Sequence, residues 1–296
     1  MSDSHQEFLG VTVLVHVELP EAETNEDVAE LQRLVESAGG VAQEIIICRR
    51  DAPDPNSFIG SGKVDEVSAA VSAIEADTVV FNSRLSPAQE RNLERALGVR
   101  VMDRIALILL IFAQRARTYE GKLQVELARL QYEQARLVRG WTHLERQKGG
   151  FGLRGGPGET QIELDRRALR QRIALVKKDL EVVAARREQN RSLRRRNSMS
   201  VVSFVGYTNA CKSTLFNRLC NSEVYAADQL FATLDPTLRT VELPVLGKTV
   251  FADTVGFIRH LPHDLVAAFR STLEETAQAD LLLHIVDASD PRLSDN

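Results

Sequence analysis

The sequence is poor in cysteine and has no long apolar run. Its three cysteines, Cys48, Cys211 and Cys220, are too few and too widely spaced for a disulfide framework or a metal site. No apolar stretch approaches the roughly 20 residues that a membrane span needs, and the polar first residues do not resemble a secretory signal peptide. We therefore expect reduced thiols in a cytoplasmic protein without a membrane span.

An excess of one sign of charge is also lacking, since 37 Lys and Arg face 41 Asp and Glu. The balance is uneven along the chain, because residues 136–196 contain 17 basic and 7 acidic side chains, a net +10 that leaves −14 for the remainder. A basic middle between acidic ends indicates a polyanionic partner. The alternative interpretation is the solvated face of a coiled coil. RNA is favoured over duplex DNA because no DNA-reading motif is recognisable.

A length of 296 residues is enough for two or three domains, each with its own core. In the first 115 residues, β-branched apolar runs alternate with amphipathic segments, a pattern typical of a small parallel α/β domain. The predicted strands are 11–19, 44–48, 78–81 and 99–102, and the predicted helices are 26–37, 63–75 and 86–97. Within this domain lies the segment FIGSGK at 58–63, for which a helix-entry turn is favoured over a second phosphate-binding loop.

Residues 116–198 are predicted to form a long antiparallel helical hairpin, after an apolar helix at 105–113. Apolar residues recur with 4–3 spacing in both of its helices, 121–147 and 160–196. In the first helix they are Leu123, Leu127, Leu130, Leu137, Trp141 and Leu144, and in the second Ile162, Leu169, Ile173, Val176, Leu180 and Val183. The loop at 149–159 contains six glycines and one proline, so it cannot bury a core and exposes Arg154 at the tip.

The last third of the chain is organised around an apolar run at 201–205 that breaks at Gly206 and restarts as an amphipathic segment at Lys212. Its residues fit GxxxxGKS/T, the loop whose backbone N–H groups surround a phosphate at a helix N-terminus. In this pattern Lys212 reaches the phosphate oxygens and Ser213 offers its hydroxyl to Mg²⁺. The second glycine is lacking, because Cys211 stands in its place. A left-handed backbone there costs a non-glycine residue about 1–2 kcal/mol.

A long segment without periodicity follows at 225–237 and suits a switch loop that orders around a γ-phosphate. Thr233 is the residue in it that we place on Mg²⁺. Two predicted strands, 238–243 and 248–252, then lead to the motif DTVG, in which Asp253 holds Mg²⁺ through water and the Gly256 amide binds the γ-phosphate. Because this DxxG motif follows a phosphate loop, a P-loop GTPase domain over 199–296 is favoured over kinases and other ATPases.

Four motifs carry a resemblance to a known family. They are GYTNxxKSTLFN, FATLDPT, DTVGFIRHLPHDLV and, between the two long helices, GGPGETQ. The match covers nearly the whole chain and resembles the HflX family, within the Obg–HflX group of translation GTPases. The resemblance implies a GTPase that binds GTP or GDP with Mg²⁺ and associates with the large (50S) ribosomal subunit and its rRNA. It implies a role in rescue or splitting of stalled ribosomes or in ribosome biogenesis, and some members also bind ATP. We expect a monomer.

The same resemblance gives roles to individual positions. The nucleotide-binding residues that it implies are Gly206, Tyr207, Thr208, Asn209, Ala210, Cys211, Lys212, Ser213, Thr214, Phe231, Ala232, Thr233, Leu234, Asp235, Asp253, Thr254, Val255 and Gly256. The Mg²⁺ ligands are Ser213 and Thr233, and no catalytic side chain is assigned. The candidate RNA contacts are Arg154, Gly155, Gly156, Arg166 and Arg167.

Two further absences bear on activity. Phe257 stands where Ras-like enzymes keep a water-orienting glutamine, so we expect slow intrinsic hydrolysis that a partner, the ribosome, accelerates. The guanine-selecting NKxD motif does not occur before the last residue, Asn296, and we expect a fragment or interrupted version of a longer protein. Two alternative functions stay open: an rRNA-binding module whose nucleotide switch is impaired by Cys211, and an ATPase, which has only the phosphate loop in its favour.

Overall fold

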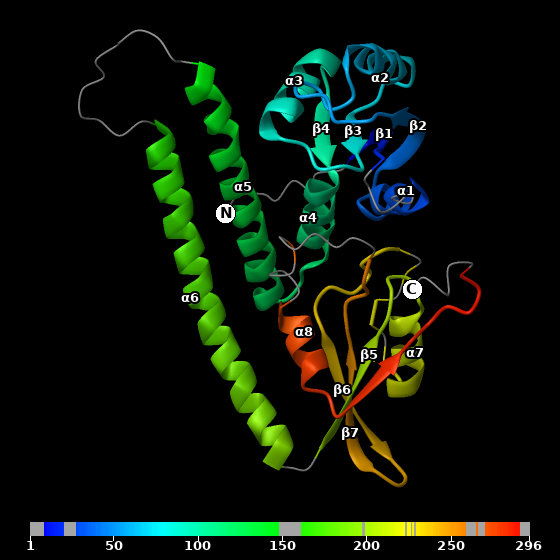
Figure 1. The fold of residues 1–296 in the computed structure, drawn as a ribbon. Coiled ribbons are helices and arrows are strands. Elements are labelled where there is room, and N and C mark those ends of the chain that lie inside the picture. The colour runs from blue at the N-terminus through cyan, green and yellow to red at the C-terminus, as the bar shows by residue number, and fades with distance from the viewer. Residues whose placement is uncertain are drawn as a thin grey trace. The chain divides into compact units, whose positions relative to one another are not determined.

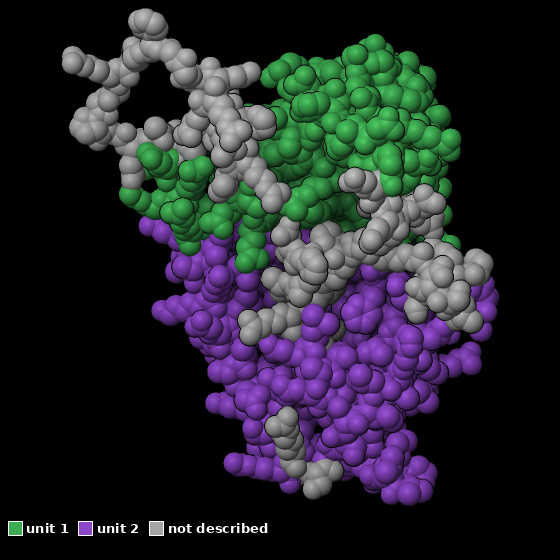
Figure 2. Space-filling view, viewed as in Figure 1, with its two compact units in different colours: residues 1–114, 131–170 green, residues 115–130, 171–296 purple. Residues whose placement is uncertain are grey.

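The computed structural model describes residues 9–20, 28–147, 161–196, 199–222, 224–225, 227, 229–258, 265 and 270–290. Contacts between Cα atoms divide the chain into two compact units, coloured separately in Figure 2. The first comprises Met1–Gln114 and Gln131–Arg170, and the second comprises Arg115–Leu130 and Gln171–Asn296. The division into three domains at 115 and 198 stays a prediction.

The first unit contains a parallel sheet with helices between its strands (Figure 1). Its strands are β1 (Val11–Glu18), β2 (Val41–Arg49), β3 (Thr78–Phe81) and β4 (Arg100–Asp103), and its helices are α1 (Val28–Ser37), α2 (Ser61–Ala73), α3 (Pro87–Leu97) and α4 (Arg104–Arg115). The strand order is β2-β1-β3-β4, and every pairing is parallel. The predicted α/β class and the predicted strands and helices of this region are confirmed.

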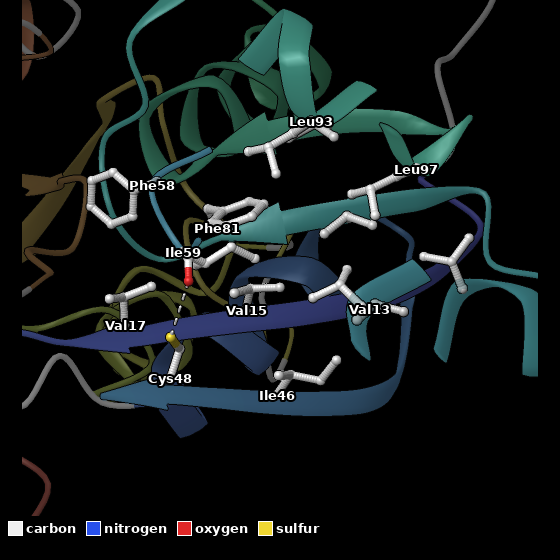
Figure 3. Close-up of a cluster of buried hydrophobic side chains, with 14 of the residues drawn as sticks. Val13, Val15, Val17, Ile46, Cys48, Phe58, Ile59, Phe81, Leu93 and Leu97 are labelled. Carbon is white, nitrogen blue, oxygen red and sulfur yellow. Dashed lines mark hydrogen bonds between the residues drawn. The ribbon is translucent and has the colours of Figure 1, made fainter. Parts of the chain in front are cut away.

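The core of this sheet follows from the alternation of side chains along each strand, which places every second residue on one face. Val13, Val15 and Val17 of β1 point toward Leu93 of α3 and pack with Phe81 of β3 (Figure 3). Cys48 belongs to the same cluster, and burial raises the pKa of its thiol. The cysteine is therefore a protonated core residue, and all three cysteines are free thiols in the structure.

The FIGSGK segment forms the entry to α2. Phe58 and Gly60 have φ angles of 68° and 80°, and the helix begins at the next residue, Ser61. A side chain from before the turn stabilises it, because Nη1 of Arg50 donates to the carbonyl oxygen of Ile59 at 2.7 Å. This geometry is a helix-entry turn, the interpretation that the sequence favoured.

The second unit contains a four-stranded sheet with the order β6-β7-β5-β8. Its strands are β5 (Ser200–Val205), β6 (Thr237–Leu243), β7 (Gly247–Asp253) and β8 (Leu281–His284), and its helices include α7 (Lys212–Cys220) and α8 (Arg270–Ala277). β5 pairs in parallel with β7 and β8, whereas β6 and β7 form an antiparallel hairpin. Phe204 of β5, Phe216 of α7 and Phe251 of β7 pack together beneath the phosphate loop. The partial P-loop sheet that the sequence predicted is confirmed.

The two long helices are α5 (Tyr119–Gln147) and α6 (Gln161–Arg196). Within the second unit, the predicted seam is confirmed where Leu123 and Leu127 of α5 pack against Ile173 and Val176 of α6. Charged pairs give the direction of the helices: Glu120 contacts Arg187 at 2.9 Å, and Glu126 contacts Arg172 at 2.6 Å. Rising numbers on α5 meet falling numbers on α6, so the helices are antiparallel. The described helices include none that is long and apolar enough to cross a membrane.

The later turns of α5 are fixed within the first unit by a buried polar network. The Tyr132 hydroxyl donates to Oδ1 of Asp103 at 3.0 Å, and Nη1 of Arg136 donates to the Tyr132 oxygen at 2.6 Å. Arg136 also forms an ion pair with Glu90 of α3. Burial and the neighbouring Asp103 raise the pKa of Tyr132, so the hydroxyl stays protonated and keeps its role as donor.

Candidate functional site

The predicted phosphate loop connects β5 to α7. Its backbone is pinned to the segment after β7, because Thr208 N donates to the Phe257 carbonyl oxygen at 2.8 Å and Phe257 N donates to the Gly206 carbonyl oxygen at 3.1 Å. Phe257 therefore supports the loop through its main chain, and the residue is 39% exposed. A phenyl ring cannot orient water by hydrogen bonds, so this position supplies structure and no catalytic group.

Lys212 lies at the start of α7 with only 6% of its surface exposed. Its Nζ atom donates to the Tyr207 carbonyl oxygen at 2.6 Å, which places the ammonium group inside the curve of the loop. Burial lowers the pKa of Lys212 to about 8, and the negative charge of Asp253 opposes that shift. A desolvated cation beside the first amides of a helix favours a polyanion such as a phosphate chain.

Three oxygen-bearing side chains meet at the carboxyl end of β7. Ser213 Oγ donates to Oδ2 of Asp253 at 2.7 Å, and Thr233 Oγ1 donates to the same oxygen at 3.1 Å. The two hydroxyl oxygens are 2.8 Å apart. Asp253 is fully buried, burial raises its pKa, and its Oδ1 atom has no hydrogen-bond partner. A buried carboxylate oxygen without a partner beside two hydroxyl groups fits a hard divalent cation that takes oxygen ligands.

Gly256, the glycine of the DxxG motif, is required because the phosphate loop passes very close to it. A Cβ atom on Gly256 would lie 2.5 Å from Thr208 Cα and 2.8 Å from Lys212 Nζ. No real Cβ approaches backbone atoms so closely, so a larger residue would push the phosphate loop away from β7. The glycine thus allows the two predicted phosphate-binding segments to lie side by side.

Cys211 has a left-handed backbone conformation, which suits the glycine that the phosphate-loop motif has at this position. Its φ and ψ angles are 59° and 23°, in the left-handed region, and the residue is exposed. Asn209 also has a positive φ, 63°, and asparagine tolerates this region better than most residues. The sequence-based expectation of a strained residue at position 211 is confirmed for the backbone. Whether the thiol weakens nucleotide binding stays a prediction.

These segments enclose a cavity of about 360 Å³. The predicted residues that line it are Thr208, Asn209, Cys211, Lys212, Ser213, Thr214, Phe231, Ala232, Thr233, Thr254 and Gly256. Of the other predicted residues, Gly206, Tyr207, Ala210, Leu234, Asp235, Asp253 and Val255 are not among the lining residues. A cavity of this size can hold a small ligand.

The sequence prediction missed three residues of the cavity wall. Ala227 and Gln229 lie in the segment that was predicted to be a switch loop, but no motif marks their positions. Asp287 follows β8, and only the pairing of β8 with β5 brings it to the cavity. A polar residue just after a strand of a parallel sheet is a signal that could have singled out Asp287.

The carboxylate of Asp235 is turned toward the start of α5. Its Oδ2 atom accepts hydrogen bonds from the backbone N–H groups of Arg117 and Thr118, both at 2.8 Å. Of the candidate RNA contacts, Arg166 is half-buried and Arg167 is exposed on α6. Arg154, Gly155 and Gly156 lie outside the described residues.

The geometry of the site defines a class of protein. A lysine-bearing loop between a buried strand and a helix, beside a second strand that ends in a carboxylate, is the arrangement of P-loop nucleotide-binding proteins. Family profiles match three consecutive parts of the chain. Their descriptions are "GTP-binding GTPase N-terminal" for residues 25–113, "GTP-binding GTPase Middle Region" for 115–194 and "50S ribosome-binding GTPase" for 201–296.

Curated relatives named "GTPase HflX" specify the family. The Escherichia coli protein is 61% identical over 96% of this chain and 66% of its own length. The Alkalihalophilus pseudofirmus protein is 46% identical over 98% of this chain and 69% of its own length. The chain therefore belongs to the HflX family, and it spans about two thirds of the length of these relatives.

A solved structure shares the architecture. It is a GTP-binding protein from the hyperthermophilic archaeon Sulfolobus solfataricus in complex with GDP. The TM-score is 0.51 at 26% identity, covering 96% of this chain and 74% of that chain.

Proposed function

We propose that this chain binds GTP and GDP together with Mg²⁺ in the cavity between the phosphate loop and β7. The observation that carries the proposal is the convergence of Ser213, Thr233 and Asp253 next to the buried ammonium group of Lys212. The GDP complex of the archaeal relative and the family descriptions support the choice of a guanine nucleotide.

Ser213 and Thr233 are the side chains that would hold the Mg²⁺ ion, with Asp253 behind them. When bound, the ion neutralises charge on the phosphate oxygens. Lys212 holds the phosphate chain from the opposite side of the loop. The Gly256 amide is the group that we place against a γ-phosphate, so that the segment after β7 distinguishes a triphosphate from a diphosphate.

Hydrolysis of GTP by the isolated protein should be slow. Phe257 occupies the position of a water-orienting glutamine, and its backbone N–H and carbonyl groups are hydrogen-bonded to the phosphate loop. We propose that the large ribosomal subunit is the partner that accelerates the reaction and that the basic helix α6 contributes to rRNA binding. The description "50S ribosome-binding GTPase" for residues 201–296 supports this partner.

The test is a calorimetric titration of the chain with GTP and with GDP, in the presence of Mg²⁺ and then of a chelator. We expect Asp253→Asn to weaken GTP binding in Mg²⁺ by at least about tenfold, or about 1.4 kcal/mol, because the amide removes the charge behind the ion. The matched control is Asp179→Asn, the same change at an exposed position on α6. A folded native chain that gives no heat with either nucleotide would rule out the proposal.

A second candidate function is favoured by one observation. Cys211 holds a left-handed backbone and lines the cavity, which is a reason for weak nucleotide binding. The chain would then act as an rRNA-binding module with an impaired switch. In that case binding to the large subunit persists without nucleotide and falls steeply with salt. Loss of subunit binding whenever GTP is withheld would exclude it.

A further inference from the structure

Asp235 is bonded to the beginning of α5, although it lies in the loop that follows α7. Oδ2 of Asp235 accepts the backbone N–H groups of Arg117 and Thr118, both at 2.8 Å. Oδ1 accepts the hydroxyl proton of Thr118 at 2.7 Å. These three hydrogen bonds are called the Asp235 cap below. They are exposed to solvent, so they are strong only while the loop holds Asp235 in position.

The Asp235 cap completes the N-terminus of a helix. Thr118 precedes Tyr119, the first residue of α5, and its Oγ1 atom accepts the N–H of Gly121 at 2.9 Å. The first N–H groups of any helix lack partners inside the helix, and a negative charge there is favourable. Thr118 supplies the local partner, and Asp235 supplies the negative charge from a distant part of the sequence.

Gly121 is the residue that lets Asp235 come so close. A Cβ atom at position 121 would lie 1.9 Å from Oδ1 of Asp235. Alanine is the better helix former at an ordinary helical position. The glycine therefore serves the approach of the carboxylate, and a methyl group there would displace Asp235 without removing its charge.

The same loop also forms part of the nucleotide cavity. Thr233, two residues before Asp235, bonds to Ser213 and Asp253 at the proposed Mg²⁺ position. Phe231 and Ala232, which directly precede Thr233, also line the cavity. A loop this short cannot release Thr233 from the site and keep Asp235 in place without a change in its backbone.

Three further contacts join the earlier part of the loop to the same stretch of chain. Gln229 lines the cavity, and its Oε1 atom accepts a hydrogen bond from Nη2 of Arg115 at 2.5 Å. The Tyr225 ring lies beneath two guanidinium groups, with its centroid 5.8 Å from Cζ of Arg115 and 5.6 Å from Cζ of Arg117. Residues 115–121 thus contact the loop at both of its ends.

We propose that the Asp235 cap couples the state of the nucleotide to the N-terminus of α5. A triphosphate with Mg²⁺ holds Thr233 in the site, this fixes Asp235, and Asp235 orders residues 117–121. Asp235 is a positioning residue, because it acts on the nucleotide through Thr233. The inference rests on the proposed function, since it needs a nucleotide that discriminates between two states of the loop. Coupling of this kind is reciprocal, so the cap strengthens triphosphate binding by the same factor.

The first test measures affinities for a non-hydrolysable GTP analogue and for GDP, both with Mg²⁺, in the full chain. Asp235→Asn should weaken binding of the analogue by about fivefold or more while GDP affinity changes by less than about twofold, because GDP lacks the phosphate that holds the loop. Asp179→Asn is the matched control, since it makes the same chemical change on the exposed side of α6. Its ratio of the two affinities should equal that of the native chain.

The second test introduces Gly121→Ala. Its methyl group displaces the carboxylate of Asp235, and α5 can still form because alanine is a good helix former. It should lower the affinity for the analogue as Asp235→Asn does, and the double variant should be no weaker than either single variant. Hydrogen exchange gives a readout apart from affinity. In the native chain the analogue should slow exchange of the Arg117 and Thr118 amides relative to GDP, and in both variants this difference should vanish.

The outcomes separate this inference from the proposed function. If the native chain binds neither nucleotide, the proposed function fails. If it binds both and the two variants keep the native ratio of affinities and the native exchange difference, the coupling is overturned and nucleotide binding stands. Additive losses in the double variant would also overturn it, because two changes that break one contact cannot each contribute in full.

Discussion

At the scale of single residues, Cys211 is the position with the clearest consequence. Its φ angle of 59° lies in the left-handed region, where a non-glycine residue is strained. Relief of that strain by Cys211→Gly raises the stability of the fold, but glycine also gives the unfolded chain more freedom. These two effects nearly cancel, and the free energy of unfolding should change by less than about 1 kcal/mol.

The affinity for GTP should respond differently, because Cys211 is one of the residues that line the cavity. Glycine removes the Cβ and thiol from the path of the phosphates, and we expect GTP to bind roughly tenfold tighter, or about 1.4 kcal/mol. Calorimetric titration of both forms with GTP and Mg²⁺ measures the difference. Cys220→Ala provides the control, since Cys220 is half-buried, does not line the cavity and should leave the affinity unchanged when it is replaced. Equal affinities for the native and glycine forms would show that the loop accommodates the thiol.

At the scale of elements, α8 is tied to α6 by one buried carboxylate. Glu275 of α8 is 4% exposed in its side chain and lies 3.3 Å from Arg187, 3.3 Å from Arg194 and 3.7 Å from Arg191. Arg187 also contacts Glu120 of α5 at 2.9 Å, so one chain of charges joins three helices. A buried ion pair contributes little compared with apolar packing, but removal of one partner is costly.

Glu275→Gln should therefore destabilise the second unit by about 2–3 kcal/mol. The amide keeps the shape but leaves three neighbouring arginines without a buried negative charge. The value is below the full cost of an unpaired buried charge because Arg187 and Arg191 have other acidic partners. Urea unfolding measures the free energy. Glu242→Gln, at an exposed position on β6, is the control and should lie within about 0.5 kcal/mol of the native value. Equal free energies of unfolding for the two variants would mean that the charge of Glu275 does not stabilise the second unit.

Elements with a strong local pattern were predictable from the sequence. The β-branched run VTVLVHVE became β1, whose central residues are buried on both faces of the sheet. The 4–3 spacing of Leu123 and Leu127 identified a real seam, because it reflects burial on one face of a helix. Contacts between distant segments were not predictable. Nothing local in FATLDPT indicates that Asp235 reaches Thr118, since that contact depends on how the loop folds back. The same holds for Asp287, which reaches the cavity only through the pairing of β8 with β5.

At the scale of the whole molecule, the uneven charge found in the sequence is carried by exposed side chains of α6. The basic residues of α6 that are exposed are Arg167, Arg170, Arg172, Lys177, Lys178, Arg186 and Arg196. Several acidic residues share the helix, but the apolar seam takes only part of its surface. Most of its positive charge therefore faces solvent, where it can meet phosphate groups without the cost of desolvating a buried ion.

If this surface binds rRNA, affinity must follow the release of counterions. Arg167→Gln with Arg170→Gln removes two positive charges, so the slope of log affinity against log salt should become shallower by about 1.4–1.8. The measurement is binding of large-subunit rRNA over a series of salt concentrations. The matched control removes two exposed charges from the β6–β7 hairpin, Arg239→Gln with Lys248→Gln. This double variant should keep the native slope. An equal change of slope in both double variants would mean that RNA affinity depends on the net charge of the protein alone. The proposal that α6 is the RNA-binding face would then be wrong.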